Sequence, residues 1–184
     1  MFDATVTPSI RAAPRMKISI ADSRSDAKSL ARLFQNSISA AYISHSELQG
    51  PRAVRADEWV ANVKDVFFHE ISERLKEPRQ SFPSGQNWKG IIEVHDGDAL
   101  VGLAFVTLSH DAAVPYGIIE DIVVDKSRRS GGLGEQIMRW IFAQMEAAGI
   151  RRQFLESGIG NESAHHLFER LGFKTVSVVM MRDG

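Results

Sequence analysis

Residues 118–134 read IIEDIVVDKSRRSGGLG, and this stretch decides the fold. The apolar, β-branched residues at 118–124 predict a buried strand, and a basic, glycine-rich turn follows it. Apolar side chains then recur at helical spacing over residues 133–148, which predicts an amphipathic helix that ends at Gly149. A strand that enters a helix through such a turn brings free backbone N–H groups and the positive end of a helix dipole to one point. That point can bind a phosphate group.

The turn has the spacing Arg129-x-x-Gly132-x-Gly134. Glycines lack Cβ atoms and let a bulky anion approach the backbone closely, and an arginine such as Arg128 can bind phosphate oxygens in bidentate fashion. The spacing is neither that of a P-loop, which needs a Gly-Lys-Ser/Thr ending, nor the dinucleotide pattern G-x-G-x-x-G. An ordinary strand–turn–helix with a few surface arginines is the alternative interpretation.

Outward from this stretch, hydrophobic periodicity predicts the remaining helices and strands. Asp96-Gly97 between two apolar runs indicates a hairpin, and Ser23 with Asp26 resembles a helix capping box. The predicted strands are 16–21, 88–95, 99–109, 118–124, 153–157 and 173–181, and the predicted helices are 27–38, 58–76, 133–148 and 162–171. This order predicts a three-layer α/β (α+β) fold with a mixed sheet that residues 173–181 close. We expect one domain over residues 16–184, after a flexible tail at 1–15.

Composition excludes several classes of function. The 184-residue chain has a net charge of −1, whereas a sequence-independent nucleic-acid binder is normally far more basic. The chain contains no cysteine, so disulfides, cysteine metal sites and thiol nucleophiles are excluded. Its longest apolar run, 99–106, is far shorter than the ~18 residues that a membrane span needs. We therefore expect a cytoplasmic protein that has no nucleic-acid or membrane partner.

A second pattern, near the C-terminus, is Asn161-x-x-Ala164-x-x-Leu167-Phe168, followed by Gly172-Phe173. Together with the turn at 129–134 and the order of elements from 16 to 181, it resembles the GNAT N-acetyltransferase superfamily. The resemblance implies a three-layer α/β/α fold with a mostly antiparallel central sheet that is splayed at the cofactor site. It also implies that an acetyl group passes from acetyl-CoA to a primary amine by direct attack in a ternary complex, without a metal ion.

The same resemblance assigns roles to particular residues. It places acetyl-CoA against the central strand, the turn and the last helix, and the implied cofactor-binding residues are Ile122, Val123, Val124, Arg129, Ser130, Gly131, Gly132, Leu133, Gly134, Asn161 and Phe168. The backbone of the three strand residues would bind the pantetheine arm and polarise the thioester, and the turn would hold the diphosphate. A backbone N–H aimed at the developing oxyanion contributes strongly to acyl transfer in general.

Glu120 is the expected general base, because it lies on the central strand beside the expected thioester. A lysine-like amine with a pKa of ~10.4 is almost entirely protonated at pH 7, so a base matters most for such an acceptor. A structural or acceptor-binding carboxylate is the other interpretation of Glu120. Since side chains alternate along a strand, we expect Asp121 to face the opposite side.

Phe168 departs from the family pattern, in which many members have a tyrosine that is proposed to protonate the departing thiolate. Phenylalanine cannot donate a proton, although a thiol of pKa ~8.5 can leave as a thiolate without a protein acid. Tyr42 and Tyr116, the only tyrosines, could reach the site from loops, and His165 or His166 could supply an acid. Partly exposed helical histidines are the plainer interpretation of the last two.

The expected acceptor is a small-molecule or peptide amine bounded by the loops 39–56, 79–87 and 110–116, and the family resemblance allows a homodimer. An acyl-CoA-binding regulatory or interaction domain without turnover is the alternative function, since Phe168 removes the family's acid. A plain nucleotide-binding α/β protein, which would prefer NAD or ATP to coenzyme A, is a third interpretation.

Overall fold

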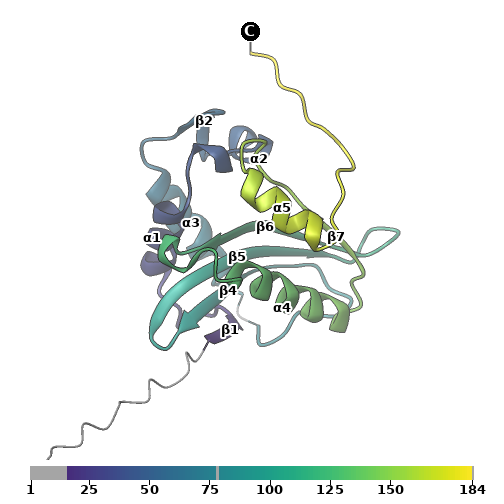
Figure 1. The fold of residues 1–184 in the computed structure, drawn as a ribbon. Helices are drawn as coiled ribbons and strands as arrows, with labels where there is room; N and C mark the ends of the chain where they lie inside the picture. The colour runs from purple at the N-terminus through teal and green to yellow at the C-terminus, as the bar shows by residue number, and fades with distance from the viewer. Residues whose placement is uncertain (1–15, 78, 184) are drawn as a thin grey trace, which may run out of the picture.

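The computed structural model, which describes residues 16–77 and 79–183, is built around a five-stranded sheet (Figure 1). The strand order is β1-β4-β5-β6-β7, with every neighbouring pair antiparallel except β6 and β7, which are parallel. The strands are β1 Met16–Ile20, β4 Trp88–Asp96, β5 Ala99–Ser109, β6 Tyr116–Val124 and β7 Arg152–Leu155. The predicted hairpin joins β4 to β5 at Gly97, which has the positive φ of 60° that such a turn requires.

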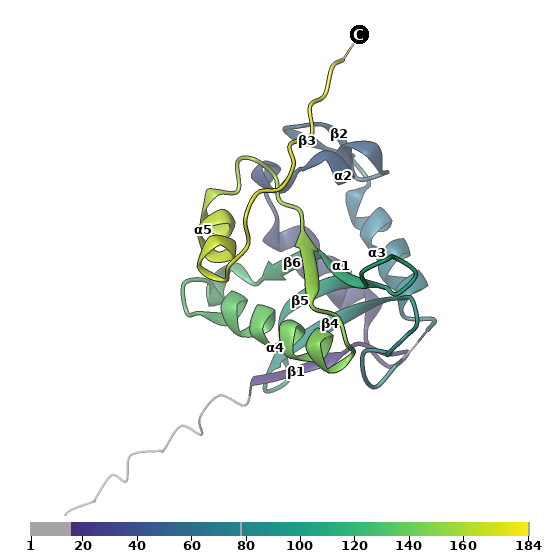
Figure 2. The same cartoon turned by 90° about the vertical axis from the view of Figure 1, so that its right-hand side faces the viewer.

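Helices cover both faces of the sheet, which confirms the three-layer α/β/α fold with a mostly antiparallel sheet (Figure 2). One face carries α1 (Ala27–Ser37) and α3 (Val63–Arg74), whose buried side chains form one core with β5. The other face carries α4 (Leu133–Ala147) and α5 (Glu162–Arg170), which share a second core with β4, β5 and β6. The sheet therefore separates two hydrophobic cores.

The segment between α1 and α3 differs from the prediction. Residues 58–76 do not form one helix: α3 begins only at Val63, and residues 58–59 belong to a small two-stranded ribbon. Trp59 and Val60 pack on the edge of the α1–α3 core without being helical, so their apolar spacing imitates a longer helix. The other elements of this segment are the 3₁₀ turn η1 (Ala40–Tyr42), α2 (His45–Gln49), β2 (Ala53–Arg55) and β3 (Glu58–Trp59).

The cap of α1 differs from the prediction, although the helix starts where it was expected. The helix begins at Ala27, and its N-cap is Asp26 instead of Ser23. The Asp26 carboxylate accepts a hydrogen bond from the Lys28 amide at 3.0 Å and another from the Ser29 hydroxyl at 2.7 Å. Aspartate satisfies orphan helix amides directly, so the Ser23–Asp26 pair is not a capping box.

One extra residue in β6 changes the direction of its side chains. Phe105 of β5 pairs with Asp121, whereas the next residue, Val106, pairs with Ile119, so Glu120 has no partner of its own on β5. This arrangement is a β-bulge, which interrupts strict alternation. The prediction that Asp121 faces away from Glu120 is therefore wrong. Both carboxylates lie on the sheet face that carries α3, where Arg52 donates to Asp121 and Arg74 of α3 donates to Glu120.

The C-terminal segment does not close the sheet as predicted. Residues 172–183 contain no strand, and the chain runs past α5 and away from the body (Figures 1 and 2). The apolar residues after Phe173 are exposed, namely Val176, Val178, Val179, Met180 and Met181. A β-prone sequence becomes a strand only beside a partner edge, and none is paired with this segment in the single chain.

Gly158, which follows β7, lies against the backbone of the η1 region without room for a side chain. A Cβ atom placed there would lie 2.4 Å from the Ala41 carbonyl oxygen and 2.5 Å from that of Ile43, both of which are backbone atoms. We therefore expect Gly158→Ala to lower the free energy of unfolding by about 1–3 kcal/mol, as overpacking does. Urea denaturation would measure this loss.

Gly160→Ala is the matched control, because its Cβ would meet only the Cβ and Cα atoms of Ala41, at ordinary distances of 3.4 and 3.6 Å. Equal urea midpoints for the two variants would contradict the close packing of the loop against η1.

Candidate active site

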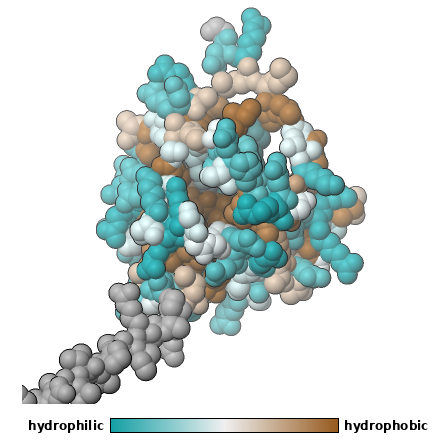
Figure 3. Space-filling model, viewed as in Figure 1, coloured by the Kyte–Doolittle hydropathy of each residue, from teal (hydrophilic) through white to brown (hydrophobic). Residues whose placement is uncertain are grey.

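A cavity of about 490 Å³ opens where β6 and β7 separate. Pairing of the two strands runs from Tyr116 with Arg152 to Ile119 with Leu155, and it stops there. The cavity is lined by β6, by the end of β7, by α5 and by side chains from α2 and α3. In the space-filling view, hydrophobic side chains lie recessed in the middle of this face, with hydrophilic ones around them (Figure 3).

Beyond Ile119, β6 offers unpaired backbone groups to the cavity side. The Asp125 amide donates to the Val101 carbonyl of β5 at 2.9 Å, so by alternation the Val123 amide also points toward β5. The amides of Ile122 and Val124 then point away from β5. The Ile122 amide indeed donates to the Tyr42 hydroxyl at 3.3 Å. An extended ligand with amide groups could pair with this edge.

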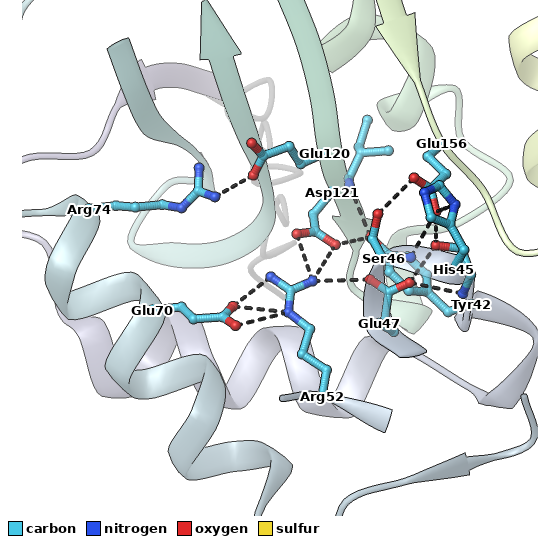
Figure 4. Close-up of polar contacts among 12 residues, drawn as sticks. Tyr42, His45, Ser46, Glu47, Arg52, Glu70, Arg74, Glu120, Asp121 and Glu156 are labelled. Atoms are coloured by element: carbon cyan, nitrogen blue, oxygen red, sulfur yellow. Dashed lines mark hydrogen bonds and ion pairs between the residues drawn. The ribbon is translucent and has the colours of Figure 1, made fainter. Parts of the chain in front are cut away.

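Charged residues dominate the polar lining of the cavity. Carboxylates outnumber arginines by five to two, and the residues are Glu47, Glu70, Glu120, Asp121 and Glu156 with Arg52 and Arg74 (Figure 4). The groups come from five separate parts of the chain, and the fold alone brings them together. Sequence reasoning identified Glu120 and Asp121, but it missed Arg52, Glu70, Arg74 and a site role for Glu156, since no spacing pattern marks them.

Arg52 is the centre of this cluster. Its guanidinium contacts Glu70 at 2.6 Å, Asp121 at 3.0 Å and Glu47 at 3.2 Å, and its side chain is only 11% exposed. It also lies 5.3–5.7 Å from the ring centroids of three phenylalanines, Phe34, Phe67 and Phe105. Burial lowers the pKa of Arg52, but the carboxylates of Asp121 and Glu70 outweigh it and raise that pKa above its usual value. The guanidinium is therefore held charged inside the protein.

Asp121 connects this cluster to the backbone of β6. Burial raises the pKa of its carboxyl to about 6, although Arg52 and the Tyr42 hydroxyl oppose the shift. The Tyr42 hydroxyl donates to Asp121 Oδ1 at 2.8 Å and accepts the Ile122 amide. Burial beside Asp121 also raises the pKa of Tyr42 well above its usual value. A chain of contacts thus runs from Arg52 through Asp121 and Tyr42 to the backbone of Ile122.

Glu120 points into the same cavity from the bulge. Its carboxylate accepts hydrogen bonds from the Arg74 guanidinium of α3 and from the Thr107 hydroxyl of β5. Arg74 in turn lies 4.6 Å from the centroid of the Phe105 ring. The structure therefore places the predicted base in the cavity, paired with a cation that sequence reasoning did not identify.

The opposite wall holds Glu156, directly after β7. Its carboxylate accepts hydrogen bonds from the hydroxyls of Ser44 and Ser46 and lies 2.7 Å from His45 Nδ1. Burial alone would raise its pKa, but these hydrogen bonds outweigh it and lower the pKa below its usual value. Glu156 thereby ties the end of β7 to α2 across the cavity.

The turn before α4 has the geometry that its glycines suggested. Gly132 is the N-cap of α4 with φ of 77°, and Ser130 has φ of 64°. Within the described part of the chain, the amides of 130–132 make no hydrogen bond. The amides of 133–135 lie in the first turn of α4, where no intrahelical acceptor exists. Six consecutive donors at a helix N-terminus can together bind an anion.

The two arginines of the turn contact the protein itself. Arg129 donates to the Val124 carbonyl at 3.2 Å and to the Ser37 carbonyl at the end of α1. Arg128 pairs with Asp96 at 2.8 Å. Both side chains therefore hold the turn against the body, each through some of its five N–H donors, and the backbone amides of the turn are further donors without a protein acceptor.

The remaining predicted residues fall into two groups. Asn161 and Phe168 of the α5 region line the cavity, as does Tyr42, whereas His165 and His166 do not. Tyr116 lies instead beside a shallow apolar hollow next to β7. Among the described residues, no group of three histidine or acidic side chains is placed to bind a metal ion. None of their helices has the length and apolar character needed to cross a membrane.

The profile of the family described as "Acetyltransferase (GNAT) family" matches residues 53–173. Three similar solved structures are aminoglycoside N-acetyltransferase AAC(6')-Iy in complex with CoA, aminoglycoside 6'-N-acetyltransferase AAC(6')-IG from Acinetobacter haemolyticus, and ribosomal-protein-alanine N-acetyltransferase from Brucella melitensis. Their TM-scores are 0.62, 0.61 and 0.59, at 15%, 14% and 15% identity. The alignments cover 95%, 91% and 91% of this chain and 98%, 97% and 99% of theirs. At this identity the likeness shows the fold alone. No curated protein sequence matches the chain significantly.

Removing Arg52 would leave buried carboxylates without a cation. We expect Arg52→Met to lower the free energy of unfolding by about 3–5 kcal/mol at pH 8, as the loss of one partner of a buried pair does. Without Arg52, the pKa of Asp121 rises above about 6, so the folded state binds more protons than the unfolded state at mildly acidic pH. Stability of the variant therefore falls as the pH rises, and the loss is smaller at pH 5 than at pH 8. Urea midpoints at both pH values would measure it.

Arg55→Met is the matched control, because the Arg55 side chain is 70% exposed and pairs only with the exposed Glu58. It should stay within about 0.5 kcal/mol of the parent chain. An Arg52→Met variant whose loss does not depend on pH would contradict the role of Asp121 as an uncompensated buried acid.

Proposed function

The chain belongs to the acetyltransferase (GNAT) family of acyltransferases, and on this premise we propose that it transfers an acetyl group from acetyl-CoA to a primary amine. One observation carries the proposal. The edge of β6 beyond Ile119, which has no strand partner on this side, borders the carboxylate-lined cavity, and the same strand leads into the turn with its free amides. Such an arrangement provides a place for the acyl chain, for the diphosphate and for an amine.

We propose that the pantetheine arm of acetyl-CoA pairs with the open edge of β6. The edge amides that can pair with the ligand are those of Ile122 and Val124. The amide of Val123 points toward β5, so Val123 would only space these two donors along the strand. The Ile122 amide would leave the Tyr42 hydroxyl and donate to the thioester oxygen, which gains negative charge as the amine attacks. Asn161 and Phe168 would contact the cofactor arm from the α5 side.

The diphosphate would be held by the backbone amides between Ser130 and Gly134, with the positive end of the α4 dipole behind them. Gly131 and Gly132 leave the backbone open to the phosphate oxygens. Arg129 would support this binding by fixing the turn to the end of α1, in addition to its long-range positive charge.

In the proposed reaction the amine nitrogen bonds to the thioester carbon, the carbon–sulfur bond breaks, and the proton of the amine passes to Glu120. Glu120 suits this role by its position in the cavity at the bulge. Phe168 cannot protonate the leaving thiolate, and the Tyr42 hydroxyl already donates its proton to Asp121. The thiolate would therefore leave unprotonated and gain its proton from solvent.

The charge of the cavity favours a cationic acceptor. Five carboxylates face two arginines, and each arginine is already paired with one or more of these carboxylates. A positively charged small molecule or peptide amine would thus enter against an attractive potential. The acetyltransferases with similar folds act on unlike acceptors, so the acceptor class is inferred here from the cavity alone.

Binding of acetyl-CoA, followed by calorimetry, tests the cofactor assignment. We expect the parent chain to bind coenzyme A and Gly131→Val to bind it about tenfold or more weakly, because the new side chain blocks the free amides. A Cβ at this position meets nothing nearer than the Arg128 carbonyl at 3.8 Å, so the fold should persist. Affinity for pantetheine, which has no diphosphate, should not change.

If the parent chain binds no acyl-CoA, the proposal fails. If it binds acetyl-CoA but releases no thiol with any of a panel of amines, an acyl-CoA-binding regulatory domain replaces the enzyme as the function.

Glu120→Gln tests the base. We expect kcat at pH 7 to fall about 10²-fold or more, as the loss of a general base does. The deficit should narrow toward pH 9, because more of a lysine-like amine is then neutral without help. Glu73→Gln on the exposed side of α3 is the control and should leave kcat unchanged. A Glu120→Gln variant with a raised KM and an unchanged kcat would instead assign Glu120 to acceptor binding.

A further inference from the structure

We propose that Tyr42 competes with the acyl oxygen of the cofactor for one backbone amide, that of Ile122, and thereby sets how strongly the protein distinguishes acetyl-CoA from free coenzyme A. The inference rests on the proposed function, since it takes acetyl-CoA to lie along the edge of β6. It assigns a specificity role to a side chain of η1, which lies outside the strand and the turn that would hold the cofactor.

The Tyr42 hydroxyl occupies the amide that the acyl oxygen would need. It accepts a hydrogen bond from the Ile122 amide at 3.3 Å, just beyond the last pair between β6 and β7 (Figure 4). One N–H group makes a well-aligned hydrogen bond with a single oxygen atom. A carbonyl oxygen can therefore take this amide only when the Tyr42 oxygen gives it up.

Packing and charge hold the Tyr42 hydroxyl in this place in the free protein. The Tyr42 ring lies edge-on to the Phe34 ring, with centroids 5.9 Å apart, and 6.4 Å from the Trp59 ring. Burial beside Asp121 raises the pKa of Tyr42, so the hydroxyl keeps its proton and donates it to Asp121 Oδ1 at 2.8 Å. The phenol oxygen is thus left as an acceptor for the Ile122 amide.

The two hydrogen bonds of Tyr42 differ in strength. The bond to Asp121 has an ordinary length and a carboxylate acceptor, and such charge-assisted bonds are stronger than neutral ones. The bond from the Ile122 amide is long and joins two neutral groups. A ligand therefore needs to break only the weaker bond. Tyr42 can stay on Asp121, and the ion pair between Asp121 and Arg52 is preserved.

This exchange makes the acyl oxygen a weak source of net affinity. Acetyl-CoA gains a hydrogen bond from the Ile122 amide but removes the one that Tyr42 accepts, and replacing one neutral acceptor by another changes the free energy little. Coenzyme A has no acyl oxygen, so it leaves Tyr42 in place. The protein then binds the product of acetyl transfer nearly as tightly as the acyl donor, and its rate follows the ratio of acetyl-CoA to coenzyme A.

Tyr42→Phe tests the competition, because it keeps the ring and removes only the competing oxygen. Calorimetry would compare acetyl-CoA with S-ethyl-coenzyme A, which has no carbonyl oxygen, in the parent chain and in the variant. We expect the variant to bind acetyl-CoA about fivefold more tightly than the parent does, with an unchanged affinity for S-ethyl-coenzyme A.

Tyr116→Phe is the matched control, because Tyr116 lies at the apolar hollow beside β7 and does not line the cavity. It should alter neither affinity. The parent chain supplies a measurement that needs no variant: its affinities for acetyl-CoA and coenzyme A should differ by less than about threefold.

The outcomes separate this inference from the proposed function. If the parent chain binds neither acetyl-CoA nor S-ethyl-coenzyme A, the two fall together. If both ligands bind and Tyr42→Phe leaves the ratio of their affinities unchanged, or weakens acetyl-CoA, only the competition by Tyr42 is overturned. A parent chain that prefers acetyl-CoA to coenzyme A by more than about tenfold overturns it as well.

Discussion

A single extra residue in β6 shapes the candidate active site. The bulge at Glu120 turns the strand over, so that Ile119 faces the α4 core while Asp121 faces the α1–α3 side. Pairing with β7 ends at the residue before the bulge. The same irregularity therefore opens a backbone edge and directs two neighbouring carboxylates to one cavity. A regular strand could do neither, because its side chains would alternate and its edge would stay paired.

Two carboxylates that point inward lose part of their hydration, which disfavours their charged forms, and arginines compensate for this loss. Asp121 is almost fully buried, and Arg52 reaches it from the segment before β2. Arg74 reaches Glu120 from α3. Both guanidiniums lie near the ring of Phe105, so the cations are held by aromatic faces as well as by charge. The ion pair between Arg52 and Asp121 thus keeps the α2–β2 segment close to the sheet, and this segment forms one wall of the cavity.

Local patterns in the sequence predicted the elements that depend on neighbouring residues. The strand–turn–helix at 118–134, the hairpin at Gly97 and the helix over 133–148 follow from periodicity and turn chemistry, and the structure contains them. Partners distant in sequence were not predictable: Arg52 and Asp121 are brought together only by folding, and a bulge leaves no mark in the alternation of residues. The prediction of a strand after Phe173 was wrong for another reason. β-propensity was read correctly as a preference, but a strand also needs an edge to pair with.

In the turn before α4, the arginine side chains make structural contacts, and the backbone amides are the donors that we propose for the diphosphate. Its arginines first suggested an anion site by their charge, yet Arg128 is paired with Asp96 and Arg129 donates to two carbonyls. The backbone amides, by contrast, have no competing acceptor among the described residues. Amides fixed by the left-handed conformations of Ser130 and Gly132 are pre-organised, so they need no side-chain ordering when a ligand binds. In the proposed cofactor site, the arginine side chains would therefore support the turn, and the backbone amides would contact the diphosphate.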